Sequence, residues 1–307
     1  MHTVIVTGGS GFVGRHAISA LRKANLKVSG FTRTQSTADL IAVDYLDTVA
    51  LTKELRGVEV VVHIAGLAHI SSKIMTDPPA IFRAANVDVA VSVARASIQA
   101  GVKKILLLSS AGVLGAFSPP NGFNDSSPPS PYDAYTLSKL EAEQQILEVA
   151  RGKLALTILR PPMVYGPDAP GSYRRLCSWI DRRLPLPISS IRARRSFVGI
   201  RNLCDLIVTI AISAHETKNG ALLVADSDPL TVAEFARNVA FVRGKSAVLL
   251  PVPQPLLKWM LGAAGLKEEY RRLAFPFELH PTQASSVFGW RPPYSLREEL
   301  SWAALGA

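Results

Sequence analysis

Tyr135 and Lys139 stand four residues apart in a segment with a helical pattern. Because positions i and i+4 share one face of a helix, the two side chains would be neighbours. An ammonium group beside a phenol stabilises the phenolate and lowers the pKa of the phenol toward neutrality. A tyrosine tuned in this way can act as a general acid or base on an alcohol or sugar carbon, so both residues are candidate catalytic residues.

A serine at the end of a strand is the third candidate. Ser110 follows the apolar run 104–108, which predicts a buried strand, and open α/β sheets bind ligands at the carboxyl ends of their strands. Its hydroxyl could orient a substrate oxygen toward Tyr135. Ser130 and Pro131 predict the start of the helix that carries Tyr135, as an N-cap residue and a proline at the first helical position. A tyrosine–lysine pair alone is common on helix surfaces, but this setting favours catalysis.

The elements that must position these groups begin with a glycine-rich turn after the apolar run 2–6. Gly8 allows a tight turn, Gly11 lets backbone N–H groups approach a pyrophosphate, and Gly14 lets the next helix pack closely on the strand. The spacing is GxxGxxG, where most dehydrogenases have GxGxxG, and the helix N-terminus adds partial positive charge. Strand, turn and helix together predict a dinucleotide site, with contacts from Gly8, Gly11, Phe12, Val13 and Gly14.

The residues after the next strands bear on the choice of cofactor. Strand 27–31 is followed by Thr32, where NAD-preferring folds carry an acid for the ribose 2′-OH, and by Arg33, which could accommodate a 2′-phosphate. This favours NADP(H); NAD(H) is the alternative, since arginine can also stack on adenine. Asp44 is a candidate for the adenine amine, and the small Ala65 would let the cofactor lie close.

Strands alternate with helices through the first half of the chain, which predicts an α/β fold with a Rossmann-type doubly wound parallel sheet. Residues 1–165 are expected to form the NAD(P)-binding domain, joined by a returning strand near 221–225. Residues 166–307 are expected to form mostly a smaller substrate-binding lobe. The predicted elements of the first domain are strands 2–6, 27–31, 40–43, 58–64, 104–108 and 154–159, a helix at 80–100 and the helix ending near Ala150.

The composition points to an anionic partner. The 307 residues carry a formal net charge of +10, and arginines accumulate between residues 174 and 201. A nucleic-acid site would need more aromatic side chains between these arginines for base stacking, so a diphosphate site on a basic face explains them better. The histidines have no metal-ligand spacing, and no metal is implied.

The chain is expected to be cytoplasmic. Its two cysteines, Cys177 and Cys204, suggest a reducing compartment, and the sequence starts in a predicted strand with no signal peptide. The apolar stretch 255–266 is too short for a bilayer and is interrupted by Lys258, so no integral membrane segment is expected. It is interpreted as a core helix, with contact to a membrane surface as the alternative.

A set of motifs, in order along nearly the whole chain, resembles the extended short-chain dehydrogenase/reductases, which include nucleotide-sugar epimerases, dehydratases and reductases. The motifs are residues 7–14, 63–65, 109–115, 135–139, 160–167, 195–198 and 288–292.

The resemblance implies a role for each matching residue. Tyr135 would be the acid/base and Ser110 its partner, while Lys139 would bind the nicotinamide ribose and tune the tyrosine. Asn86 matches a position that lines the active site, and Arg195 matches an arginine that holds the substrate diphosphate. The resemblance also places Pro161 at the cofactor and implies a homodimer.

The same resemblance leaves three reactions open. Ala111 and Gly112 stand where dehydratases carry an Asp-Glu pair, which argues against simple dehydration, and Thr32 weakens the case for resident NAD. The run 184–197 is most similar to bacterial UDP-4-keto-6-deoxy-HexNAc C4 reductases of surface-polysaccharide (including lipopolysaccharide) synthesis. The expected activity is therefore NADPH-linked reduction at C4 of a UDP-sugar. The alternatives are a 4-epimerase with tightly bound NAD and, without chemistry, an NADP-sensing regulator.

Overall fold

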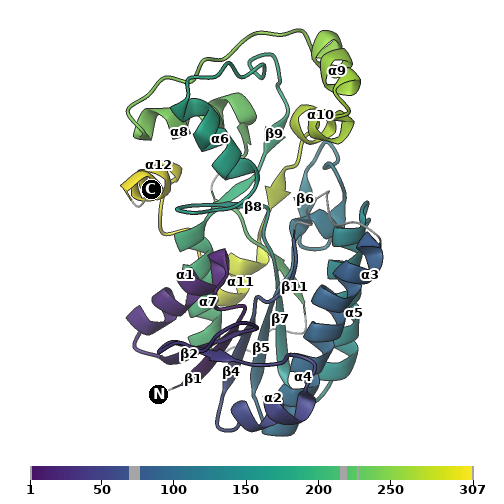
Figure 1. The fold of residues 1–307 in the computed structure, drawn as a ribbon, viewed down its shortest axis with the longest axis vertical. Coiled ribbons are helices and arrows are strands. Elements are labelled where there is room, and N and C mark those ends of the chain that lie inside the picture. The colour runs from purple at the N-terminus through teal and green to yellow at the C-terminus, as the bar shows by residue number, and fades with distance from the viewer. Residues whose placement is uncertain (1, 69–76, 215–219, 227, 306–307) are drawn as a thin grey trace.

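A computed structural model describes residues 2–68, 77–214, 220–226 and 228–305. Seven parallel strands form one sheet in the order β11-β7-β5-β4-β1-β2-β3 (Figure 1). This arrangement confirms the predicted doubly wound α/β fold. The strands are β1 (Thr3–Thr7), β2 (Lys27–Thr32), β3 (Leu40–Ala42), β4 (Val60–His63), β5 (Lys104–Leu108), β7 (Ala155–Arg160) and β11 (Ala221–Leu223).

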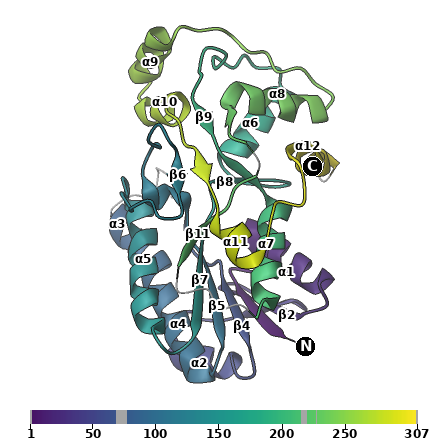
Figure 2. The ribbon, with the colours of Figure 1, turned by 180° about the vertical axis from the view of Figure 1, so that it is seen from behind.

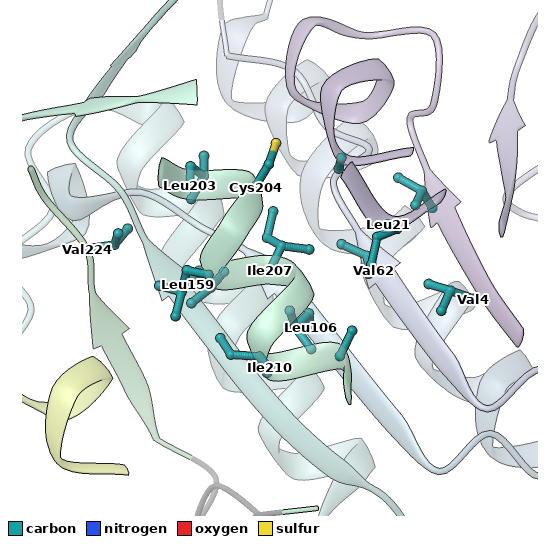
Figure 3. Close-up of a cluster of buried hydrophobic side chains, with 14 of the residues drawn as sticks. Val4, Leu21, Val62, Leu106, Leu159, Leu203, Cys204, Ile207, Ile210 and Val224 are labelled. Atoms are coloured by element: carbon teal, nitrogen blue, oxygen red, sulfur yellow. The ribbon is translucent and has the colours of Figure 1, made fainter. Parts of the chain in front are cut away.

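Helices cover both faces of the sheet. One face carries α1 (Phe12–Lys23) and α7 (Ile200–Ile212), and the other carries α2 (Thr48–Glu54), α4 (Val89–Ala100) and α5 (Ala134–Ala150). Alternate residues of a strand point to opposite faces, so Val4 and Val6 pack toward α1 and α7 while Ile5 packs toward α4 and α5. Figure 3 shows the first of these two cores. Burial on both faces explains why the strands are continuous apolar runs.

Two helices differ from their predicted form. The helix that carries Tyr135 begins after Asp133 and not at Ser130, because Asp133 accepts a 2.7 Å hydrogen bond from the Thr136 backbone N–H in a capping box. The predicted helix 80–100 consists of α3 (Pro78–Phe82), one π-helical turn, η1 (Arg83–Asp88), and α4.

The second lobe sits at the carboxyl edge of the sheet (Figures 1 and 2). Its aromatic core includes Phe197 and Phe235, whose rings stack at 4.1 Å. The chain leaves the lobe to place β11 beside β7 and then re-enters it. The lobe contains α6 (Ser172–Asp181), α8 (Val232–Val242), α9 (Gln254–Ala263), α10 (Lys267–Ala274), α12 (Leu296–Leu305) and the short pairs β8 (Met163–Tyr165) with β10 (Phe197–Gly199), β9 (Arg194–Arg195) with β12 (Leu230–Thr231), and β6 (Phe123–Asn124) with β13 (Leu279–His280). Helix α11 (Gln283–Phe288) returns to the sheet and packs against α7 and β11.

Helix α9 covers most of the apolar stretch 255–266, and it is not the core helix expected from its composition. Only Leu257 is buried among its ten residues. The sequence is apolar on all sides, so its pattern could not show that one side would stay in solvent. Among the described residues, no helix combines the length and apolar character needed to cross a membrane.

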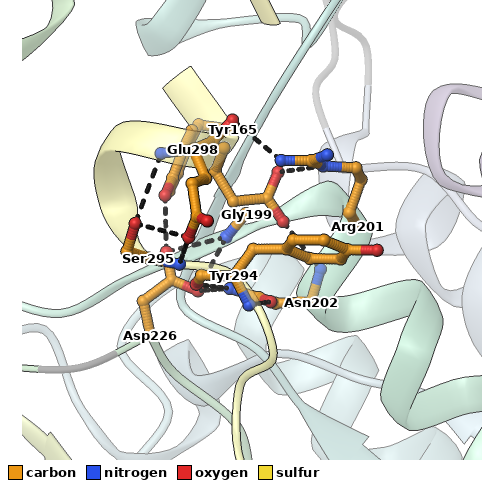
Figure 4. Close-up of polar contacts among 9 residues, drawn as sticks. Tyr165, Gly199, Arg201, Asn202, Asp226, Tyr294, Ser295 and Glu298 are labelled. Carbon is orange, nitrogen blue, oxygen red and sulfur yellow. Dashed lines mark hydrogen bonds and ion pairs between the residues drawn. The ribbon is translucent and has the colours of Figure 1, made fainter. Parts of the chain in front are cut away.

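Two carboxylates, the half-buried Asp226 and the buried Glu299, join the lobe to the N-terminus of α7, and Figure 4 shows the contacts of Asp226. Asp226 accepts hydrogen bonds from the Gly199 N–H at 3.0 Å, the Tyr165 hydroxyl at 2.6 Å and the Asn202 side chain at 2.7 Å. Glu299, on the C-terminal helix α12, accepts from the Asn202 N–H at 2.8 Å. Both carboxylates satisfy N–H groups that a helix N-terminus leaves unpaired, and together they tie three distant parts of the chain to one point.

Replacement of Glu299 tests this junction through pH. Burial, with the nearby Asp226 adding to it, raises the pKa of Glu299 from 4.5 to about 7. The folded protein therefore binds this proton more tightly than the unfolded chain, and the resulting stability, on the order of 3 kcal/mol, is lost as pH rises from about 4.5 through about 7. Glu299→Gln should flatten the free energy of unfolding, measured with urea, across that range. Glu298→Gln, at the exposed neighbour, should retain the fall; retention in Glu299→Gln as well would refute the assignment.

Candidate active site

Helix α5 presents Tyr135 and Lys139 at the carboxyl end of β5. The Lys139 ammonium donates a 2.6 Å hydrogen bond to the carbonyl of Leu108, the last residue of that strand. Ser110, two residues on, accepts a 3.1 Å hydrogen bond from the Gly112 N–H, and its side chain is also hydrogen-bonded to Tyr135. The structure therefore brings together the three residues predicted to be catalytic.

The protonation of the pair differs from the sequence-based expectation. Burial raises the pKa of the Tyr135 phenol above its ordinary value, and the hydrogen bond from Ser110 offsets only part of that rise. Lys139 was expected to lower this pKa, but its ammonium is directed to the Leu108 carbonyl, and burial lowers its own pKa to about 8. Tyr135 is thus a neutral phenol with a proton to donate.

A buried ion pair lies one helical turn beyond Lys139. Arg160, at the end of β7, donates to both carboxylate oxygens of Glu143, with Nε–Oε1 at 3.0 Å and Nη2–Oε2 at 2.5 Å. Glu143 raises the pKa of Lys139 and so opposes the effect of burial. Tyr135, Lys139 and Glu143 recur every four residues, and the arginine fixes the last of them in place. Sequence reasoning missed this ion pair, although the four-residue spacing from Lys139 to Glu143 can be read in the sequence.

The glycine-rich turn is shaped by steric contacts that exclude larger residues. Gly8 has φ +68°, and a Cβ on it would lie 2.9 Å from the Ala65 backbone. A Cβ on Gly14 would lie 2.1 Å from the Gly8 carbonyl oxygen. Gly11, the N-cap of α1, has no side-chain cap, so N–H groups of the first turn, which includes Phe12 and Val13, are available to an anion. These features fit the pyrophosphate of a dinucleotide.

The expected adenosine end of the site contains one residue that the sequence did not single out. The Tyr45 hydroxyl accepts a 2.9 Å hydrogen bond from the Gly8 N–H, and burial raises its pKa to about 12. Thr32 is buried, with its hydroxyl 3.3 Å from that of Ser10. Arg33 and Asp44 are both exposed beside these groups. The only sequence feature that could have pointed to Tyr45 was its position directly after the candidate Asp44.

Asn86 lies on the π-helical turn η1, where an extra residue per turn re-aims a side chain. Its amide donates to the Leu67 carbonyl at 3.0 Å and to the Ser138 hydroxyl at 2.9 Å, and it accepts from the Leu67 N–H at 2.7 Å. A Cβ on Gly66 would meet both Asn86, at 2.8 Å, and the Lys139 ammonium, at 3.9 Å. In this structure the predicted substrate residue connects the loop after β4 to the catalytic helix.

A cavity of about 550 Å³ opens beside the N-terminus of α5, between the loop 114–133 and helix α10. Arg195 lies near this cavity and donates a 3.0 Å hydrogen bond to the Phe275 carbonyl. Burial lowers the pKa of its guanidinium to about 10, and the nearby Tyr132, which lines the cavity, opposes this shift. Sequence reasoning identified Arg195 but missed the lining side chains, which come from two segments far apart in the sequence. They include Phe117, Tyr132, Arg271 and Arg272.

Pro161 continues from the end of β7, and its carbonyl accepts a 2.8 Å hydrogen bond from Ala111, the residue after Ser110. Ala65 lies at the end of β4, where its N–H donates to the Thr7 hydroxyl at 3.1 Å. Both predicted cofactor residues thus lie at the same edge of the sheet as the glycine-rich turn. In the part of the chain that the structure describes, His, Cys, Asp and Glu side chains form no cluster that could hold a metal.

Comparison with known proteins agrees with this geometry. Residues 4–225 match the family model described as the NAD dependent epimerase/dehydratase family. A UDP-glucose 4-epimerase from Vibrio cholerae is 31% identical, with 98% of this chain and 94% of the relative covered.

Solved structures show the same fold. A UDP-N-acetylglucosamine 4-epimerase from Bacillus cereus superposes with a TM-score of 0.81 at 19% identity, covering 99% of both chains. A UDP-glucuronic acid 4-epimerase from the same organism, solved in complex with NAD, gives 0.80 at 20% identity and covers 99% of this chain and 98% of the other. The chain belongs to the NAD dependent epimerase/dehydratase family, within the extended short-chain dehydrogenase/reductases.

Proposed function

We propose that this chain is an NAD(P)-dependent oxidoreductase that acts at C4 of a UDP-sugar, reducing a 4-keto-6-deoxy-HexNAc nucleotide sugar for surface-polysaccharide synthesis. The observation that carries the proposal is the neutral, buried phenol of Tyr135, held by Ser110 at the end of β5 with the Lys139 ammonium one turn away. The nucleotide-sugar relatives support the substrate class. The proposal includes that the enzyme forms a homodimer and works in the cytoplasm.

The residues divide the work of the reaction. A bound nicotinamide supplies hydride to the sugar carbon. Tyr135 donates its proton to the oxygen that becomes the C4 hydroxyl, and Ser110 orients that oxygen with a hydrogen bond. Lys139 places positive charge near the phenolate that Tyr135 leaves behind, which lowers the cost of proton transfer. Arg195, near the cavity, would hold the substrate diphosphate.

One feature of the expected cofactor site favours reduction over epimerisation. Thr32 supplies no carboxylate for a ribose 2′-OH, and the exposed Arg33 beside it suits a 2′-phosphate. A 4-epimerase with resident NAD is the second candidate, because the Vibrio cholerae relative has that activity in its name. Denaturing the purified protein and identifying the released nicotinamide separates the two. Stoichiometric NAD would favour the epimerase, whereas little bound cofactor and tighter binding of NADPH than NADH would favour the reductase.

Tyr135→Phe should lower kcat by about a thousandfold, since a positioned acid contributes roughly 10² to 10⁴ in rate. Cofactor affinity, measured by fluorescence titration, should change little. Tyr294→Phe is a matched control, because that ring packs on Arg201 in the second lobe. Normal turnover by Tyr135→Phe would exclude the proposed mechanism.

Arg195→Ala should raise KM for the nucleotide sugar at least about tenfold, because a guanidinium bound to a phosphate makes charge-assisted hydrogen bonds in the ground state as well. The neighbouring Arg194 is exposed and donates to the Pro229 carbonyl at 3.0 Å. Arg194→Ala should therefore leave KM near the wild-type value. An unchanged KM in Arg195→Ala would remove this residue from the diphosphate site.

Glu143→Gln should shift the alkaline limb of the kcat/KM profile to lower pH by about one unit. Without the carboxylate, the pKa of Lys139 falls below about 8, and the ammonium is lost earlier as pH rises. Glu143→Asp, which retains the charge, should restore most of the limb, and Glu148→Gln, on the exposed side of α5, should not move it. A profile that Glu143→Gln leaves in place would limit the ion pair to a structural role.

A further inference from the structure

Helix α9 carries an apolar stripe that faces solvent. Leu256 is 48% exposed, Trp259 70% and Met260 46%, and Ala263 continues the stripe at the next turn. The spacing i, i+3, i+4, i+7 places the four side chains on one face of the helix. The opposite side rests on the lobe through Leu257. A contiguous exposed apolar face of this kind marks an interaction surface.

The two segments that lead to and through α9 are rich in basic residues, and the acidic Glu268 and Glu269 follow at the start of α10. Residues 182–204 include six arginines, residues 235–267 include five lysines or arginines, and neither segment has an Asp or Glu. Several of these side chains are exposed and form no ion pair with any described residue. They are Arg182, Arg183, Arg192, Lys258 and Lys267.

Parts of these two segments, residues 184–190 and 248–254, lie side by side at the end of the lobe away from the sheet (Figures 1 and 2). Leu186 forms a β-bridge with Leu249, and the Gln254 side chain donates to the Ser190 carbonyl at 3.4 Å. These two stretches carry further exposed apolar side chains. Together with α9 we call them the distal surface: Leu184, Val248, Leu250, Leu256, Trp259 and Met260, flanked by the basic residues named above.

We propose that the distal surface docks on an anionic lipid bilayer. A helix that exposes tryptophan and leucine on one face, with a lysine beside them, can bind in the interfacial region of a membrane, and flanking basic residues are attracted to anionic headgroups. A second copy of this chain fits less well, because a two-fold contact would bring two acid-free basic surfaces together. Single-stranded nucleic acid also fits less well, since Trp259 is the only aromatic ring on the surface for base stacking.

Docking would also bring the substrate cavity close to the membrane. Helix α10 follows α9 after three residues, packs against it, and supplies Glu268, Arg271 and Arg272 to the wall of the cavity. This consequence rests on the proposed function, whereas lipid binding itself does not.

Co-sedimentation with sonicated vesicles tests the proposal. The full-length protein should bind phosphatidylglycerol vesicles, bind phosphatidylcholine vesicles more weakly, and lose affinity as salt is raised. The double variant Leu256→Gln/Trp259→Gln should weaken binding at least about tenfold. Val49→Gln is the matched control: that valine is 82% exposed on α2, at the opposite end of the molecule, and should bind like wild type.

Turnover of soluble nucleotide sugar without vesicles should not differ among these proteins. This control separates a defect in folding or in the proposed activity from a defect in docking. Brominated lipid should quench tryptophan fluorescence more in the wild type than in the double variant, which lacks Trp259 and retains the other three tryptophans. The proposal is overturned if the wild type does not bind anionic vesicles, or if the double variant binds them equally well. It is also overturned if the double variant dissociates an oligomer without affecting vesicle binding, or if single-stranded RNA binds the same surface and vesicles do not.

Discussion

The close crossing of α1 over the ends of β1 and β4 is the constraint on which the rest of the structure depends. A methyl group on Gly14 would clash with the Gly8 carbonyl and push the helix away, and one on Gly8 would clash with the backbone of Ala65 in the loop after β4. The Thr7 hydroxyl holds the loop after β4 at this crossing by accepting hydrogen bonds from two of its N–H groups. The open helix end and the candidate catalytic side chains consequently meet at one edge of the sheet.

Buried charge is the second organising element. Lys139 is kept from solvent by the same burial that lowers its pKa, and the Glu143–Arg160 pair partly compensates with a negative charge one turn away. At the other side of the lobe junction, Asp226 and Glu299 are stabilised by helix N–H groups. In both places fixed partners offset part of the cost of burial: acceptors and a negative charge at Lys139, and N–H donors at Asp226 and Glu299.

The sequence predicted the sheet and the grouping of Ser110, Tyr135 and Lys139, because both follow from local spacing. It could not predict contacts that only tertiary packing creates, such as Arg160 reaching Glu143 from another strand. The start of α5 was misplaced because Ser130-Pro131 and Asp133 are competing cap signals, and the capping box decided between them. The exposure of α9 was also hidden, since an apolar helix carries no mark of the side it will bury. The roles of Asn86 and Arg195 stay predictions.

The parallel pairing of β11 with β7 has a consequence for how the chain is made. A ribosome delivers β7 well before β11, and most of α6 through α7 must emerge in between. During that interval the outer edge of β7 presents unpaired N–H and C=O groups, the template on which foreign strands add. The nascent protein thus passes through a stage in which β7 is the edge strand of the sheet and is not yet covered by β11. Chaperones would have most to protect at that stage.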